Sequence, residues 1–461
     1  NWQPPKLKHV LFVGDGSYFR YSAEGDTLDF IPVHMRQTQV FGAAASDFWY
    51  TLLSGEDEVP DINLGRLPVR STDELEILIA KMLSYEKSPP LGDWPNRFLI
   101  IGGNGVDFRS QGMALSKIVP PQFNTRLLFT VKDPKLENDP YFGGTSDLLD
   151  YIDQGCSMIT FHGHGGGAIW ADNGLLRLDD IDRFYSQGKF PFILSMTCYT
   201  GAFESPVRES LADALLFTEN EGAIAMLGAS GVGWTWNDYF LQTEILKQVY
   251  NNPEMTIGEM VTAGKIAYMA HYKTEQVISE VNQYHLLGDP ASRIVLPQQQ
   301  TEVLIDNPVL LKGDNVQVSV QTPFDQGIAY FDAEDSVKTI VARSESALSN
   351  GAASSTLLLS DDFIGESGLV RFYGADDFGA NRTNGFAAIS LKGAVFDSAY
   401  VRRTPEDSLY FHVHLSSRSP LAKVQCMALN DTLLLQTMGD GWYTSTRAVT
   451  VVWSGFQFSY F

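Results

Sequence analysis

The stretch Cys156-Ser157-Met158-Ile159-Thr160-Phe161-His162, followed directly by Gly163-His164-Gly165-Gly166-Gly167, is the most informative segment of this chain for its fold class. Its first seven residues form a mostly apolar run, which is typical of a strand buried on both faces of a parallel sheet. Its second part is a glycine-rich loop. In α/β sheets, functional residues lie beyond the carboxyl ends of the strands. The stretch therefore predicts a parallel sheet and a site at its edge.

A second stretch has the same organisation. Phe190–Met196 is another apolar run, and Thr197-Cys198-Tyr199-Thr200-Gly201 follows it as a polar loop. The carboxyl ends of neighbouring parallel strands emerge at one edge of a sheet. We therefore expect the His164 and Cys198 side chains to lie within hydrogen-bonding reach of each other.

The remainder of the first 297 residues alternates apolar runs with amphipathic stretches. Further predicted strands are His9–Val13, Phe98–Gly102 and Ala223–Gly228, and predicted helices are Ser71–Glu86, Thr145–Gln154, Glu209–Asn220 and Asn237–Tyr250. Such alternation predicts an α/β fold, a mostly parallel sheet flanked by helices.

The pattern changes after Pro297. Short alternating strands follow, including Gln317–Gln321, Gly327–Phe331, Ser355–Leu359 and Gly368–Tyr373. Gly, Asp and Asn clusters separate them, as in a β-sandwich.

We therefore expect three domains: residues 1–297 (α/β), residues 298–395 (β-sandwich) and residues 396–461. The last is a β segment with fewer strands than a sandwich usually needs. A start at Asn1 rather than Met, and an end in an aromatic run at Phe461, indicate a piece of a longer protein.

The composition excludes several classes of function. A net charge of −22 disfavours binding to nucleic acid and to anionic lipid. The longest apolar stretch, Gly222–Trp234, is shorter than the roughly 20 residues of a membrane span. Cys156, Cys198 and Cys426 are far apart and lack CxxC spacing, so neither a zinc knuckle nor a disulfide framework is expected.

The two loops supply the groups for nucleophilic catalysis. A thiol is mostly protonated at neutral pH, so Cys198 needs a base, and His164 can take its proton. The resulting thiolate attacks a carbonyl carbon. The backbone N–H groups of Gly165 and Cys198 are candidate donors to the oxyanion that forms. This chemistry needs no cofactor.

Other interpretations of the same residues remain open. A lone buried cysteine is usually a small apolar residue, and Cys156 and Cys426 are assigned that role. A His-x-His pair can bind metal, but no further acidic or cysteine ligand stands at a matching spacing. A glycine-rich loop can bind phosphate, yet the lysine and hydroxyl residue of a P-loop are absent.

Several short motifs resemble the gingipain family of cysteine peptidases, peptidase family C25, whose catalytic fold is similar to caspases. They are Gly14-Asp15-Gly16-Ser17-Tyr18, Ser46-Asp47 before Tyr50, Pro60-Asp61, Gly65-Arg66-Leu67-Pro68, Gly163-His164-Gly165, Thr197-Cys198 and Leu287-Gly288-Asp289-Pro290. The resemblance covers roughly residues 7–297. It implies a caspase-like domain followed by an immunoglobulin-like module, and a further α/β segment ahead of this chain.

The resemblance also implies roles for single residues. His164 rather than His162 is the catalytic histidine, and Asp107 is the candidate acid that steadies it. Trp234 and Trp236 match the region that closes the primary specificity pocket, with Trp236 preferred, and Asp172 could line that pocket. The alternatives are a solvated loop aspartate for Asp107 and core packing for the tryptophans. Family members also bind structural calcium, although no calcium-loop spacing occurs here.

The predicted activity is therefore a cysteine endopeptidase acting on proteins or peptides. The resemblance implies an extracellular or bacterial cell-surface location, associated with the outer membrane. Partners would be other pieces of the same precursor or secretion components. Two rival functions remain: a sortase of the type IX secretion system, which transfers instead of hydrolysing, and a non-catalytic scaffold that retains the fold.

Overall fold

The computed structural model describes residues 6–460 except positions 19–28, 207–208, 312, 361, 393, 406–407, 418–420, 422, 429–430 and 448–455. The terminal residues Asn1 and Phe461 thus lie outside the described part. The chain divides into two compact units. One comprises Asn1–Gln300 with Tyr373–Asn384, and the other Thr301–Phe372 with Gly385–Phe461.

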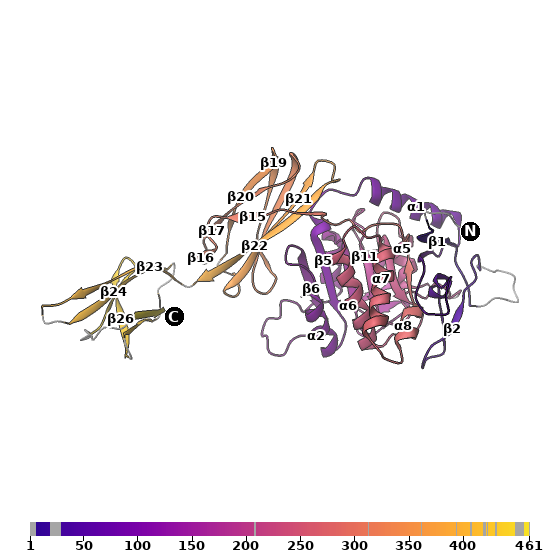
Figure 1. Ribbon diagram of the computed structural model, residues 1–461, viewed down its shortest axis with the longest axis horizontal. Coiled ribbons are helices and arrows are strands. Elements are labelled where there is room, and N and C mark those ends of the chain that lie inside the picture. Colours follow the sequence, from indigo (N-terminus) through magenta and orange to yellow (C-terminus); the bar gives the residue numbers. More distant parts are fainter. Residues whose placement is uncertain are drawn as a thin grey trace. The chain divides into compact units, whose positions relative to one another are not determined.

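An eight-stranded sheet forms the centre of the first unit (Figure 1), in the order β1-β4-β13-β12-β11-β7-β5-β6. Its strands are β1 (His9–Val13), β4 (Asn63–Leu67), β5 (Arg97–Gly102), β6 (Asn124–Phe129), β7 (Met158–His162), β11 (Phe192–Met196), β12 (Ala225–Ala229) and β13 (Tyr284–Leu287). Neighbours run parallel except β12 and β13, which are antiparallel. This confirms the predicted mostly parallel α/β sheet.

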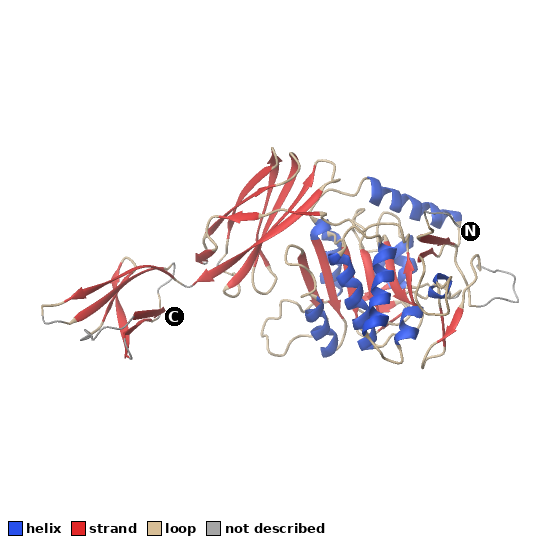
Figure 2. Cartoon of the chain, viewed as in Figure 1, coloured by secondary structure: helices blue, strands red, loops and turns tan. Residues whose placement is uncertain are grey.

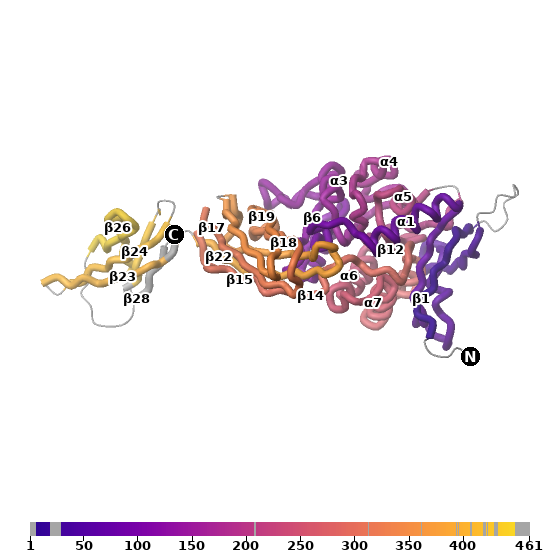
Figure 3. Tube along the Cα trace, turned by 90° about the horizontal axis from the view of Figure 1, so that it is seen from above, coloured from indigo at the N-terminus to yellow at the C-terminus, as the bar shows by residue number. Residues whose placement is uncertain are grey.

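Helices cover both faces of the sheet. They are α1 (Thr72–Lys87), α2 (Val106–Leu115), α3 (Thr145–Gln154), α4 (Leu178–Ile181), α5 (Leu211–Phe217), α6 (Thr235–Asn251), α7 (Ile257–His271) and α8 (Val277–Gln283), with short 3-10 turns η1 (Phe48–Thr51) and η2 (Trp94–Asn96). Figure 3 shows α3, α4 and α5 on one side of the strands and α6 and α7 on the other.

The apolar strands are explained by these two helical layers. In β5, Phe98 and Ile100 join the core cluster of α6 and α7, whereas Leu99 and Ile101 join that of α3 and α5. Successive side chains of a strand point to opposite faces, so a strand covered on both sides needs apolar residues throughout.

The observed strands differ from the predicted strands in their bounds and in their number. The strand predicted from Cys156 begins only at Met158, although Cys156 is buried, with 3% of its surface exposed. The strands β4, β6 and β13 were not predicted from the sequence. Each carries buried polar residues that interrupt its apolar pattern, including Arg66, Asn124 and His285.

Three of the short motifs meet in this core. The guanidinium of Arg66 binds the Asp47 carboxylate through two hydrogen bonds of 2.7 Å, and both side chains are buried. Beside them, the backbones of Gly65 and Gly288 lie close together, because a Cβ on Gly65 would come within 2.3 Å of the Gly288 oxygen. The motifs therefore contribute to packing of β4 against β13.

Two smaller sheets complete the first unit. The strands β8 (Gly165–Gly166), β9 (Ile169–Trp170) and β10 (Leu176–Arg177) form one directly after β7, and β2 (Met35–Gln37) pairs with β3 (Ala43–Ala45) in the other. No described helix is both long and apolar enough to span a membrane.

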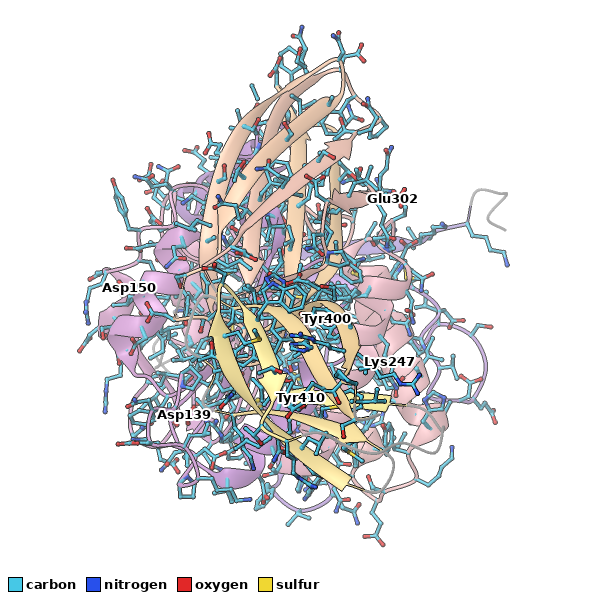
Figure 4. All side chains as sticks on the ribbon, turned by 90° about the vertical axis from the view of Figure 1, so that its left-hand side faces the viewer. Asp139, Asp150, Lys247, Glu302, Tyr400 and Tyr410 are labelled. Atoms are coloured by element: carbon cyan, nitrogen blue, oxygen red, sulfur yellow. The ribbon has the colours of Figure 1, made fainter. Side chains whose placement is uncertain are left out.

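The β-rich region contains two further sheets (Figure 2). The strands of the nine-stranded sheet are β14 (Gln299–Gln300), β15 (Val303–Ile305), β16 (Val309–Leu311), β17 (Asn315–Gln321), β18 (Gln326–Glu334), β19 (Ile340–Ser349), β20 (Ala352–Leu358), β21 (Ser367–Asp376) and β22 (Arg382–Lys392). Those of the six-stranded sheet are β23 (Val395–Arg403), β24 (Leu409–Ser416), β25 (Val424–Ala428), β26 (Asp431–Gly439), β27 (Trp442–Ser445) and β28 (Phe456–Tyr460). Figure 4 labels Tyr400 on β23 and Tyr410 on β24, which pair antiparallel.

This architecture is a caspase-like α/β unit followed by immunoglobulin-like, mostly antiparallel sheets, as the family resemblance implied. The domain boundaries after positions 297 and 395 stay predictions.

Candidate active site

Cys198 lies in the turn that follows β11. The nitrogen of Tyr199 donates to the oxygen of Gly231 at 2.9 Å, and that of Gly201 donates to the oxygen of Ala229 at 2.9 Å. Tyr199 has a φ of 59°, in the left-handed region, so the chain turns sharply at this point. Cys198 is a free cysteine and is half-buried. The turn holds the thiol at the end of β11 and against the loop after β12.

The histidine loop lies beside this turn. His162 pairs in register with Met196, so His164 and Cys198 each stand two residues beyond paired positions. A Cβ on Gly165 would come within 2.8 Å of the Thr197 hydroxyl, which shows how closely the two loops pack. Both loops therefore emerge at the same edge of the sheet. No hydrogen bond joins His164 to Cys198 in the described structure.

The two histidines of this loop have different surroundings. His162 is buried, and its Nδ1 lies 3.3 Å from the Gln242 amide oxygen. Burial lowers the pKa of His162, which favours the neutral ring. His164 is exposed, and its ring meets Phe108 edge-on at 5.1 Å between centroids. Only His164 combines solvent access with a place at the mouth of the site.

The other predicted site residues make no hydrogen bond, ion pair or ring contact with His164 or Cys198 among the described residues. Asp107 is exposed in the first turn of α2, and Asp172 is exposed in the turn after β9. Neither makes a hydrogen bond or ion pair to His164 among the described contacts. Trp234 is the residue before α6, and Trp236, in its first turn, is 55% exposed. Core packing therefore does not account for Trp236.

The sequence did not point to the acidic residues beneath the loop after β12. The carboxylate of Asp238 lies under Gly233, where an added Cβ would come within 2.5 Å of Oδ2. The Tyr284 hydroxyl donates to Asp238 Oδ1 at 2.9 Å, and the Glu280 carboxyl also contacts Asp238. The available signal was an acid at a core-facing position, because Glu280 stands three residues after Val277 and shares its face of the short helix α8.

The environment of the thiol disfavours its ionised form. Burial raises the pKa of Cys198, and the charge of Asp238 adds to this effect. The backbone N–H of Gly233 faces the sulfur and acts in the opposite direction. Cys198 is therefore a thiol at rest.

A metal ion in a protein is usually held by several histidine, cysteine or carboxylate side chains that lie close together. Among the described residues there is no group of three or more histidine, cysteine, aspartate or glutamate side chains suited to hold one. The implied calcium site consequently has no candidate side-chain cluster in this part of the chain.

Known proteins of similar sequence come from one group. Gingipain R1 of Porphyromonas gingivalis is 21% identical over 305 residues, covering 62% of this chain and 30% of that protein. Lys-gingipain W83 of the same organism is 26% identical over 198 residues, covering 42% of this chain and 11% of its own length. The chain thus spans less than a third of these relatives.

Solved structures agree on the fold. The crystal structure of the Arg-specific cysteine proteinase gingipain R matches with a TM-score of 0.51 at 15% sequence identity, over 84% of both chains. The profile of peptidase family C25 matches residues 1–295, well over half of the sequence. The chain therefore belongs to peptidase family C25.

Proposed function

We propose that this chain is the catalytic part of a cysteine endopeptidase that cleaves peptide bonds through a Cys198–His164 dyad. The observation that supports the proposal most is the register of β7 and β11, which brings the two loops to one sheet edge. Membership of family C25 supports a protein or peptide as the substrate.

The proposed mechanism starts from the protonated thiol. His164 accepts the proton of Cys198, and the sulfur attacks the carbonyl carbon of the substrate. The backbone N–H groups of Gly165 and Cys198 would stabilise the oxyanion. His164 then gives the proton to the leaving amine, and water releases the acyl group from the sulfur. Each step uses only groups of this chain, the substrate and one water molecule.

The resting structure lacks the dyad hydrogen bond, and this is compatible with the mechanism. Catalytic hydrogen bonds are often long before substrate binds and shorten in the reacting complex. Phe108 restrains the His164 ring from one side. A role for Asp107 as the third member, and for Trp236, Trp234 and Asp172 in substrate binding, stays a prediction.

The location and partners follow from the family relation alone. We propose an extracellular or bacterial surface location, where a peptidase of this family meets protein substrates. Association with the outer membrane and with secretion components stays a prediction, as does a structural calcium ion.

The test is cleavage of a peptide library by the purified chain, with products identified by mass spectrometry. Cys198→Ala should abolish cleavage while leaving the fold unchanged, and His164→Ala should slow it by about 10²–10⁴. The matched controls Cys156→Ala and Cys426→Ala alter buried cysteines and should retain cleavage.

The products also separate the rival functions. Free carboxyl termini indicate hydrolysis, whereas an adduct at the new terminus indicates transfer. Cleavage that persists in Cys198→Ala would contradict the proposal. A chain that cleaves no peptide would support the scaffold function instead.

A further inference from the structure

Two buried acids lie against each other beneath the loop after β12, which contacts the Cys198 turn. Asp238 at the start of α6 is 3% exposed and Glu280 in α8 is 0% exposed. The carboxyl group of Glu280 lies against that of Asp238 and interacts with it electrostatically. Two buried carboxylates so close together cannot both be ionised without a large cost in free energy, so the pair must hold a proton.

The proton belongs to Glu280. Its Oε1 has no N–H or hydroxyl donor among the described residues, and its Oε2 receives only a long contact of 3.4 Å from Gln283. Asp238 instead accepts a hydrogen bond from the Tyr284 hydroxyl. Burial and the neighbouring Asp238 both raise the pKa of Glu280 well above its usual range. One negative charge therefore remains on the pair, on the side of Asp238.

That charge is close to the nucleophile. The Asp238 carboxylate contacts the backbone of Gly233, whose N–H faces the Cys198 sulfur. The same loop is held from below by Gln283, which donates to the Val232 oxygen at 2.9 Å. The backbone of residues 232–233 therefore lies between the acid pair and the Cys198 sulfur.

Titratable groups on several elements face this pair. They are His162 on β7, Cys198 after β11, Tyr268 and Lys265 on α7, and Tyr284 on β13. Lys265 is the one cation among them, and its ammonium donates to the Val281 and Tyr284 oxygens rather than to either acid. Among these described groups, the negative charge is therefore not neutralised by a direct ion pair.

We propose that Asp238 is a positioning residue, whose carboxylate, held by Glu280 and by Tyr284, fixes Gly233 against Cys198 and places a negative charge beside the resting thiol. This inference rests on the proposed role of Cys198 as nucleophile. The acid pair then influences the pH at which the Cys198 thiol ionises. The negative charge of Asp238 then disfavours the thiolate, so transfer of the thiol proton to His164 costs more free energy than it would without that charge.

The experiment measures alkylation of Cys198 by iodoacetamide between pH 5 and pH 10, resolved by peptide mass spectrometry. Glu280→Gln keeps a hydrogen-bond donor towards Asp238 and should leave the midpoint of the pH profile unchanged. The double substitution Asp238→Asn with Glu280→Gln removes the charge and should lower the midpoint by on the order of one pH unit. Below the midpoint, alkylation should then be about tenfold faster.

Two results would overturn the inference. One is an unchanged midpoint in the folded double variant, because a purely structural role would not move the pH profile. The other is a midpoint in Glu280→Gln alone that falls as far as in the double variant, because Glu280 would then have carried the charge. The second result needs only the conservative single variant, so a double variant that fails to fold does not prevent the test.

Alkylation needs no turnover. A chain that cleaves no peptide but shows the expected midpoints would contradict the peptidase function and retain the inference. A chain that cleaves peptides with identical midpoints in all variants would do the reverse.

Discussion

Asp47 and Asp238 are both buried aspartates, and they contact successive residues of β13. The backbone of Asp47 meets the ring of His285, whereas the carboxylate of Asp238 accepts from the hydroxyl of Tyr284. Successive residues of a strand face opposite sides of a sheet. The two aspartates therefore serve the two faces of the same strand.

Their partners differ in charge. Asp47 is neutralised by the guanidinium of Arg66 through two hydrogen bonds. Asp238 has a neutral carboxyl and a phenol as partners and lies beside the Cys198 loop. A compensated buried charge stabilises the native packing, whereas an uncompensated one acts on its neighbours. Asp47 therefore has a structural role, whereas Asp238 has an electrostatic one.

The largest effect is expected where the charge is compensated. Asp47→Asn leaves the Arg66 guanidinium buried without a counter-charge, which should cost about 3–5 kcal/mol of unfolding free energy. Urea denaturation measures this loss. Glu58→Gln is the control, because it breaks a pair with Arg36 in which both side chains are about one-third exposed and should cost less than about 1 kcal/mol. Equal losses in the two variants would remove the distinction between the sites.

A smaller effect is expected at the loop above Asp238. In Gly233→Ala the new methyl group would lie 2.5 Å from Asp238 Oδ2, so the carboxylate or the loop must move. We expect a loss of about 1–3 kcal/mol in unfolding free energy and a changed alkylation profile of Cys198.

Gly166→Ala is the matched control for this loop substitution. Its methyl group would meet only Ile169 Cγ2, at an ordinary 3.8 Å. A Gly233→Ala chain as stable as Gly166→Ala, with an unchanged alkylation profile, would contradict the close packing of Gly233 on Asp238.

The smallest effect concerns a further buried acid, Glu204, in the segment after Cys198. Burial, with Asp213, Asp47 and Asp15 nearby, raises the pKa of Glu204 to about 8 from an ordinary value of 4.5. The folded chain thus retains a proton that the unfolded chain loses. This contribution to stability is present below pH 4.5 and is lost as the pH rises through about 8.

Glu204→Gln cannot ionise, so its unfolding free energy should rise relative to the parent chain by about 1–2 kcal/mol between pH 5 and pH 6.5. Denaturation curves at several pH values measure this difference. Glu76→Gln, on an exposed position of α1, is the control substitution. A difference that stays constant over this range would show that Glu204 ionises alike in both states.

Much of the site could be predicted because it depends on strand ends. Apolar runs identified β7 and β11, and the parallel arrangement then placed the His164 and Cys198 loops at one edge. The same reasoning did not find β13, whose Tyr284 and His285 interrupt the apolar pattern. It also could not place Asp107, because the direction of a side chain in the first turn of a helix depends on how that helix packs.

The α/β class, the change to β structure after Pro297 and the two loops that carry the candidate dyad could all be predicted from local sequence patterns. These are properties of short segments, set by side-chain period and by glycine at strand ends. The surroundings of the Cys198 sulfur, by contrast, depend on how distant segments pack together. Asp238 and Glu280 come from helices far along the chain, and a buried charge is defined by long-range packing that no local pattern records.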